Sequence, residues 1–241
     1  MNTVAEVRYA LSHMTLEDRH SIACWLEGYQ EHEPLFLEVR EPAMKDAEEP
    51  MYMSEEEYLQ FEENSPTRHE YVNGYVHAMS GASMAHNRIV SRLHTALANR
   101  LGNGPCETFM NAQKLKVDTV SDKDYFYPDI MVTCDTSGWR DLWLLNPRLI
   151  VEVLSPSTQH IDRREKASTY RKIESMEEYV IAAQSSWRLT IFRRADGWVA
   201  DIVSGPDAVA EFRSLGVSVP LAEIYRGVFP ESASAGRVVE E

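Results

Sequence analysis

Apolar and polar residues follow two different periodicities along this chain, one typical of helices and the other typical of strands. Apolar side chains recur at helical spacing over residues 15–29 and 86–101, and further helices are expected at about 160–174 and 221–228. Apolar runs of strand length lie at about 107–118, 126–134, 148–154, 178–183, 188–194 and 198–203. Because the two kinds of element alternate, we expect a mixed α/β sandwich and not a helical bundle or a barrel.

One hairpin is predicted from its turn residues. In the stretch HEYVNGYVHAM, Asn73 and Gly74 lie between two alternating strands, and this dipeptide favours a two-residue turn. Such a turn sets the register of the two strands, so that Glu70 is expected to lie opposite His77. The sequence therefore predicts a cross-strand pair of one acid and one histidine.

The chain divides into three parts by composition. Residues 31–50 are acidic, carry three prolines and lack periodicity, as is typical of a linker. Ser54 to Glu57 (S-E-E-E) forms a capping-box pattern, which predicts a helix that ends near residue 64. We expect an N-terminal amphipathic helix and acidic linker at 1–50, a main domain at 51–228 and a C-terminal tail at 229–241.

The charge of the chain is unevenly distributed. The formal net charge is -14, and residues 1–64 hold 16 acids against 4 Lys and Arg, a net charge of -12. Residues 65–241 hold 22 acids against 20 Lys and Arg, a net charge of only -2. Phosphate binding is largely electrostatic, so the negative net charge of the whole chain lowers the expectation of a nucleic-acid ligand. The nearly neutral main domain does not exclude one.

Cysteine usage and hydropathy indicate a compartment. Cys24, Cys106 and Cys134 are odd in number, widely spaced and without a CxxC pair, so we expect reduced, mostly buried thiols. No apolar run reaches the roughly 18 residues that a membrane span needs, and no signal-peptide pattern follows Met1. These observations favour a cytoplasmic protein without a membrane partner.

Two acidic residues lie inside runs that otherwise look like buried strands. Asp129 follows Pro128, and Glu152 lies between Val151 and Val153. A lone buried carboxylate is costly unless it is paired, protonated or bound to a cation. Either acid alone could pair with an arginine or a helix cap, but both on consecutive strands favour a divalent-cation site. Mg²⁺ takes carboxylate oxygens, water and phosphate as ligands.

A lysine on the next predicted helix could serve such a site. Asp162, Lys166 and Tyr170 are spaced four residues apart, so they share one helical face. An amine beside a metal site can hold the attacking water and stabilise the charge that develops on a phosphate. A simple ion pair between Lys166 and Asp162 would explain the same spacing, so both interpretations stay open.

These motifs together carry a resemblance to a known family. The PD dipeptide at 128–129, EVLSPST at 152–158 and the D-x3-K-x3-Y helix resemble the Uma family of restriction endonucleases. That family belongs to the PD-(D/E)XK nuclease superfamily, and the likeness covers roughly residues 51–228. The resemblance implies a restriction-endonuclease-like αβββαβ core. It also implies Mg²⁺-dependent hydrolysis of phosphodiester bonds, most directly in DNA, with Mn²⁺ as a substitute ion.

The same resemblance implies roles for individual residues. Asp129 and Glu152 correspond to the metal ligands, and Lys166 corresponds to the catalytic lysine. Leu154 stands where the superfamily pattern has its lysine, so the amine would reach the site from the following helix. Glu70 matches the acid before the family's hairpin turn, which implies a further catalytic residue and a ligand of the metal or of the water.

Substrate contacts are implied for five more residues. His86 matches a family position at a helix start, although a helix cap would explain it as well. Asp162, Arg163 and Tyr170 lie on the helix of the expected catalytic lysine. His77, expected beside Glu70, completes the set, with a half-exposed structural histidine as the alternative.

Three interpretations of function follow from the sequence. The first is a metal-dependent endonuclease acting on DNA. The second is a catalytically silent nuclease fold that binds nucleic acid or a protein partner, although intact Asp129, Glu152 and Lys166 argue against loss of activity. The third adds that the N-terminal arm masks basic parts of the site or contacts another subunit. A homodimer is expected, and deletion of residues 1–50 should leave a folded protein.

Overall fold

The computed structural model describes residues 51–79, 81–111, 113–118, 123–140, 142–154 and 162–229, without the side chains of 162–165. The predicted N-terminal helix and acidic linker, and all but the first residue of the predicted tail, lie outside these residues. Within them, every helix is too short or too polar to cross a membrane.

The first two helices of the described residues lie within about two residues of their predicted ranges. Helix α3 (Glu55–Asn64) opens with the expected capping box, in which Ser54 and Glu57 each accept the other's backbone N–H. Helix α4 (Met84–Leu101) is capped by Ser83 and ends at Gly102, whose φ of 54° suits glycine. Two shorter helices follow, α5 (Asp162–Tyr170) and α6 (Leu221–Ile224).

The strands form two large mixed sheets and one small hairpin. The first sheet has the order β1 (Met51–Tyr52), β3 (Tyr75–Ala78), β2 (His69–Val72), β6 (Lys123–Phe126), β5 (Lys114–Asp118) and β8 (Trp143–Leu144). The second has the order β12 (Ala200–Ser204), β11 (Arg188–Arg193), β10 (Glu178–Ala183), β9 (Leu149–Leu154), β7 (Ile130–Thr133) and β4 (Glu107–Met110). The hairpin pairs β13 (Val209–Phe212) with β14 (Val217–Pro220).

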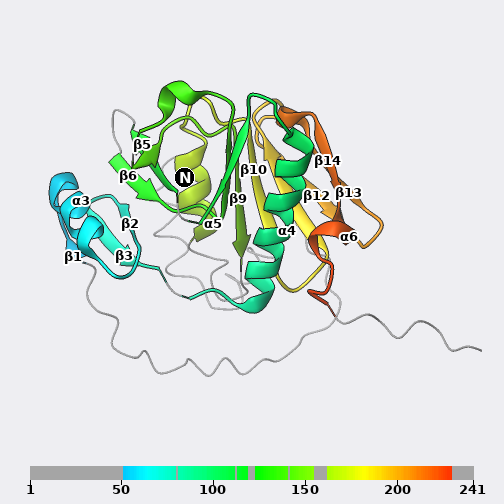
Figure 1. Ribbon diagram of the computed structural model, residues 1–241, viewed down its shortest axis with the longest axis horizontal. Coiled ribbons are helices and arrows are strands. Elements are labelled where there is room, and N and C mark those ends of the chain that lie inside the picture. The colour runs from blue at the N-terminus through cyan, green and yellow to red at the C-terminus, as the bar shows by residue number, and fades with distance from the viewer. Residues whose placement is uncertain are drawn as a thin grey trace, which may run out of the picture. The chain divides into compact units, whose positions relative to one another are not determined.

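The second sheet carries the expected core topology. Along the chain its central elements run α4, β4, β7, β9, α5 and β10, which is the predicted αβββαβ order. Helix α4 buries Ile89, Leu93 and Leu97 against one face of this sheet, and α5 buries Tyr170 against the other. Figure 1 shows α4 and α5 on either side of β9. The mixed α/β sandwich predicted from the alternation is therefore confirmed.

The hairpin register is confirmed as well. Asn73 and Gly74 both have positive φ, 52° and 87°, as a two-residue turn between twisted strands requires. Strands β2 and β3 then pair with Glu70 opposite His77.

Two predicted strands are each divided between the sheets. The run at 107–118 becomes β4 and β5, with Asn111 at a φ of 45° between them, and the run at 126–134 holds the last residue of β6 and the whole of β7. The two breaks lie side by side, because Asn111 N donates to Asp129 O at 3.2 Å. A continuous apolar run indicates that a segment is buried, but it does not indicate which strand the segment pairs with. The expectation of single strands was therefore wrong.

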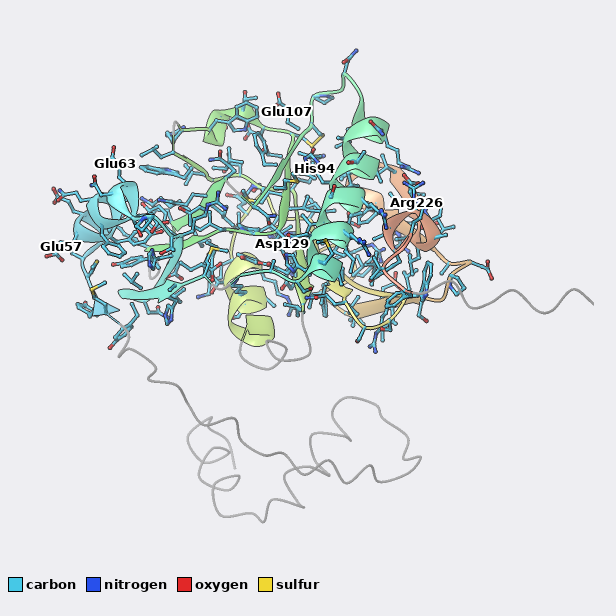
Figure 2. The ribbon with its side chains drawn as sticks, turned by 60° about the horizontal axis from the view of Figure 1, so that its bottom comes forward. Glu57, Glu63, His94, Glu107, Asp129 and Arg226 are labelled. Atoms are coloured by element: carbon cyan, nitrogen blue, oxygen red, sulfur yellow. A yellow bond between two sulfur atoms is a disulfide. The ribbon has the colours of Figure 1, made fainter. Side chains whose placement is uncertain are left out.

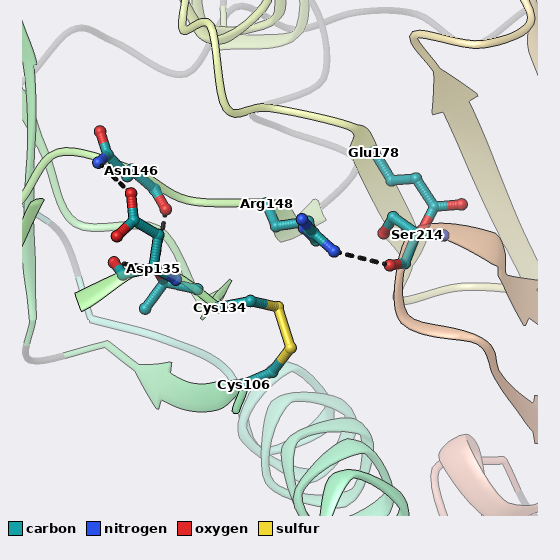
Figure 3. Close-up of a disulfide and its surroundings, with 8 residues drawn as sticks. Cys106, Cys134, Asp135, Asn146, Arg148, Glu178 and Ser214 are labelled. Carbon is teal, nitrogen blue, oxygen red and sulfur yellow. Dashed lines mark hydrogen bonds between the residues drawn. A yellow bond between two sulfur atoms is a disulfide. The ribbon is translucent and has the colours of Figure 1, made fainter. Parts of the chain in front are cut away.

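The expectation of reduced thiols was also wrong for two of the three cysteines. Cys106 and Cys134 form a disulfide (Figure 3). They lie one position beyond the pair Glu107–Thr133 of the β4–β7 ladder, so the antiparallel register sets them opposite each other. A separation of 28 residues in sequence hides this proximity. Cys24 lies outside the described residues.

Candidate active site

Asp129 and Glu152 come together where β7 and β9 begin to part. The last register pair of these strands is Ile130 with Val151, and the next pair along would be Asp129 with Glu152. Asp129 does not continue the backbone ladder. Its Oδ2 instead accepts the N–H of Val153 at 2.7 Å, which fixes the carboxylate beside the end of β9.

Glu152 is almost completely buried and has few partners among the residues that the structure describes. Strand alternation turns it toward α5, where the Tyr170 hydroxyl donates to its Oε1 at 2.9 Å. Burial raises the pKa of the Glu152 carboxyl. Lys166 lowers this pKa, the nearby charges of Asp129 and Glu70 raise it, and the Tyr170 hydrogen bond lowers it without reversing the result. The ionised form of Glu152 is therefore unfavourable in these surroundings, and a bound cation would stabilise it.

Lys166 points at the acids. Its Nζ lies 2.8 Å from Glu70 Oε1 and 3.7 Å from Glu152 Oε1. It also lies 5.8 Å from the centre of the Phe126 ring. Lys166 thus joins two carboxylates that come from different sheets, in line with the helix-borne lysine that the sequence implies.

Glu70 reaches the site from the first sheet. It lies on β2, and its Oε1 also accepts the N–H of Tyr127 at 3.3 Å. Tyr127 lies in the segment that connects β6 of the first sheet with β7 of the second. The site therefore sits at the junction of the two sheets, and the YPD motif forms part of that junction.

His86 contacts both acid strands from the first turn of α4. Its Nε2 lies 3.0 Å from Asp129 Oδ1 and its Nδ1 lies 3.0 Å from the carbonyl oxygen of Val153. Both partners can only accept, so two hydrogen bonds require a proton on each ring nitrogen. Burial alone lowers the pKa of His86, but the hydrogen bond and charge of Asp129 outweigh it and the pKa is raised.

The remaining predicted site residues differ in their surroundings. Tyr170 is buried with its hydroxyl on Glu152, so it supports that carboxylate and does not face solvent. His77 is exposed, opposite Glu70 in the ladder. Asp162 and Arg163 lie in α5, but their side chains are outside the described part of the chain. Sequence reasoning missed the backbone of Val153, whose only signal was its position next to Glu152.

The donor chemistry fits a hard cation. Asp129, Glu152 and the carbonyl of Val153 supply oxygen atoms, the ligands that Mg²⁺ prefers. Among the described residues, three or more acidic, histidine or cysteine side chains do not converge tightly enough to hold an ion by themselves. An ion held by Asp129 and Glu152 would complete its coordination with water and phosphate, as Mg²⁺ commonly does in phosphoryl-transfer sites.

Buried Glu152 and partly buried Asp129 and Glu70 thus lie with Lys166 where central strands of a mixed sheet end. The family model Uma2, described as putative restriction endonuclease, matches residues 55–222. This chain belongs to that family, and its membership supports a nuclease.

Individual proteins are also similar to this chain. Uncharacterized protein slr1290 of Synechocystis sp. is 35% identical over 179 residues, which cover 73% of this chain and 93% of that protein. Uncharacterized protein sll1609 of the same organism is 32% identical over 161 residues, covering 65% and 90%. The crystal structure of a putative nuclease belonging to DUF820 from Anabaena variabilis aligns with a TM-score of 0.61. It is 14% identical and covers 75% of this chain and 100% of that one, a likeness of fold.

Proposed function

We propose that this protein is a Mg²⁺-dependent endonuclease that hydrolyses phosphodiester bonds in DNA. The observation that carries this proposal is the convergence of Asp129, Glu152 and Lys166 at one end of β9. A structural role alone would not need an under-paired buried carboxylate with a lysine and a second acid directed at it. The nuclease family supports the same conclusion.

Each side chain has a task in this reaction. Asp129 and Glu152, with the Val153 carbonyl, would hold the ion, and His86 and Tyr170 would orient the two carboxylates. When bound, Mg²⁺ would polarise the phosphoryl group and lower the pKa of a bound water. Lys166 would donate a hydrogen bond to the attacking water or to a phosphate oxygen, where negative charge develops in the transition state.

Glu70 would hold Lys166 in place. Its carboxylate lies 2.8 Å from the amine, and Tyr127 N orients the same oxygen. A charged lysine 3.7 Å from Glu152 is available to the phosphate side of the site without a large movement. Glu70 also stays proposed as a further ligand of the metal or of the water. Its contact with Lys166 supports the site in either case.

A second candidate is a nuclease fold that binds nucleic acid or protein without turnover. One observation favours it: His86 and Lys166 already stand against the two carboxylates, so internal cations could replace a metal. Titration with Mn²⁺ in a calorimeter separates the two. The enzyme should bind Mn²⁺, and the binding should be lost in Asp129→Ala. A silent module should show no binding that depends on Asp129.

Cleavage of supercoiled plasmid tests the main proposal. The purified protein should cut DNA with Mg²⁺ or Mn²⁺ and not in EDTA, and Asp129→Ala and Glu152→Ala should be inactive. Glu107→Gln is a matched control, because this acid is exposed on β4. Full cleavage by both alanine variants would refute the site.

Partners and location are proposed from the family and the sequence. DNA as substrate rests on the family, and a homodimer with the N-terminal arm at its interface rests on the sequence alone. A cytoplasmic location stays a prediction. Its argument from reduced thiols no longer supports it, because Cys106 and Cys134 are joined. Gel filtration of the full chain and of a chain lacking residues 1–50 would test the dimer and the arm.

A further inference from the structure

Three arginines gather where α4 meets the turn after α6. Arg88 and Arg92 lie on α4, and Arg226 follows α6. Arg88 Nη1 donates to the carbonyl of Gly227 at 2.7 Å. A side chain built on Gly227 would lie 3.8 Å from Arg92 Nη2, so the second guanidinium borders the same turn.

These arginines differ from Arg100 because they form no salt bridge within the described residues, although the charge of Arg226 acts on Glu223 from a greater distance. Arg100, on the same helix, makes a paired contact with Glu223 at 2.7 and 3.1 Å. Arg92 Nη1 is instead buried without a hydrogen-bond acceptor. Burial lowers the pKa of Arg92, and the charges of Arg226 and Arg88 lower it further. Like charges held this close are unfavourable until an anion joins them.

The cluster shares helix α4 with the candidate active site. Helix α4 carries His86, which contacts Asp129, and Arg88 follows two residues later. At about 1.5 Å of rise per residue, Arg88 and Arg92 lie about 3 and 9 Å further along the helix axis. Figure 2 shows Asp129 and Arg226 on either side of α4.

We propose that Arg88, Arg92 and Arg226 form a binding site for phosphate groups of a nucleic-acid backbone that crosses the N-terminal half of α4. Guanidinium groups bind phosphate oxygens in pairs, and such contacts position a nucleic acid without reading its sequence. This inference rests on the proposed nuclease function. It adds the path by which the backbone would approach the carboxylates from the side of α4.

Binding without cleavage tests the site. Fluorescence anisotropy in EDTA would follow a labelled DNA duplex of about 20 base pairs, with an RNA duplex of the same sequence as a second probe. The triple variant Arg88→Ala, Arg92→Ala, Arg226→Ala should raise Kd at least about tenfold. The slope of log K against log salt should become shallower by at least about 1, since each phosphate contact contributes about 0.9.

Arg100→Ala is the matched control, because it removes one arginine of the same helix whose charge Glu223 already neutralises. Its Kd and salt slope should stay close to those of the wild type. Arg226→Glu is the second variant, because Arg226 is exposed and its replacement should not disturb folding. It should weaken binding more than Arg226→Ala.

The outcomes separate this inference from the proposed function. Loss of binding to either probe supports the site, and the probe affected more identifies DNA or RNA. Wild-type Kd and salt slope in both the triple variant and Arg226→Glu would overturn the site, whether or not the protein cleaves. If the wild type never cleaves but its binding depends on the three arginines, the nuclease proposal falls and the site stands.

Discussion

Two glutamates on adjacent parallel strands are both buried, but their surroundings differ. Glu178, on β10, is 1% exposed and accepts hydrogen bonds from Arg193 Nε, Arg213 N, Ser214 N and Ser214 Oγ at 2.6–3.2 Å. Figure 3 shows Glu178 and Ser214 side by side. Glu152, on β9, is 7% exposed, and its side-chain partners among the described residues are the Tyr170 hydroxyl and the Lys166 amine at 3.7 Å.

The register places Glu178 in the first pair of these two strands and Glu152 three pairs further along. Glu178 lies opposite Leu149, and Glu152 lies opposite Ile181. Both backbones are equally regular, so burial in a strand does not distinguish a structural acid from a functional one. The number of hydrogen-bond donors around each carboxylate does distinguish them. A fully satisfied carboxylate fixes the fold, whereas one with few donors in a buried place indicates a site that awaits a ligand.

The largest expected effect is on catalysis at Glu152. Glu152→Gln should reduce the rate of plasmid cleavage by about 1,000-fold, or about 4 kcal/mol in barrier height, because it removes one charge from the proposed metal site. Glu178→Gln, assayed at a temperature where it is folded, should cleave at a rate within a few fold of the wild type. Equal losses in the two variants would mean that the comparison between the acids is wrong.

The next effect is on stability at Glu178. Glu178→Gln should lower the free energy of unfolding by about 3 kcal/mol, because Arg193 and the N–H groups of Arg213 and Ser214 lose a charged acceptor in a buried place. Arg193 keeps Asp201 as a partner at 2.6 Å, which limits the loss. Urea denaturation measures it, and an unchanged midpoint would contradict the structural role.

A smaller effect of opposite sign is expected at Glu152 without metal. Glu152→Gln should raise the free energy of unfolding by about 1 kcal/mol in EDTA, because it removes a desolvated charge and keeps an acceptor for the Tyr170 hydroxyl. The same variant should gain no further stability from Mn²⁺, whereas the wild type should. Thermal denaturation with and without Mn²⁺ checks both statements; a destabilised variant in EDTA would assign Glu152 a structural role.

The smallest effect is expected at Glu55, nearer the surface. It tests whether a carboxylate with several donors stabilises the fold there as well. Burial alone would raise its pKa, but hydrogen bonds from Lys116, Tyr125 and Lys123 outweigh burial and lower the pKa from 4.5 to about 2. The stabilisation is therefore complete above pH 4.5 and is lost as the pH falls through about 2. Because Glu55 is partly exposed, its contribution should stay below about 1 kcal/mol.

The measurement compares melting temperatures of the wild type and Glu55→Gln across this range. The wild type should melt higher at pH 6, and the difference should shrink toward pH 2. A difference that is constant with pH would show that the ion pairs at Glu55 do not stabilise the fold.

Features set by residues close in sequence were predicted correctly. The capping box of α3, the Asn73-Gly74 turn and the buried stripe of α4 each depend on residues within a few positions of one another. Features set by the choice of strand partner were not. The division of two apolar runs between sheets and the Cys106–Cys134 disulfide both depend on long-range register, which apolar patterns do not encode.

The candidate site was predictable because its residue types are unusual for their places. Acids at positions 129 and 152 stand out in apolar strands, and the family pattern adds Lys166 and Glu70. Their contact joins residues 96 positions apart, which only the fold can bring together. The exact partner of His86 was hidden for the same reason, since Asp129 lies 43 residues away from it.

The bond from Val153 N to Asp129 gives the protein an internal reporter of its own site. This N–H lies where the β7–β9 ladder ends, and its acceptor is a side chain and not a neighbouring strand. Its rate of exchange with deuterium should therefore follow the position of the Asp129 carboxylate. Any event that draws this carboxylate away from β9 would be recorded at a backbone amide, without a substrate or a substitution.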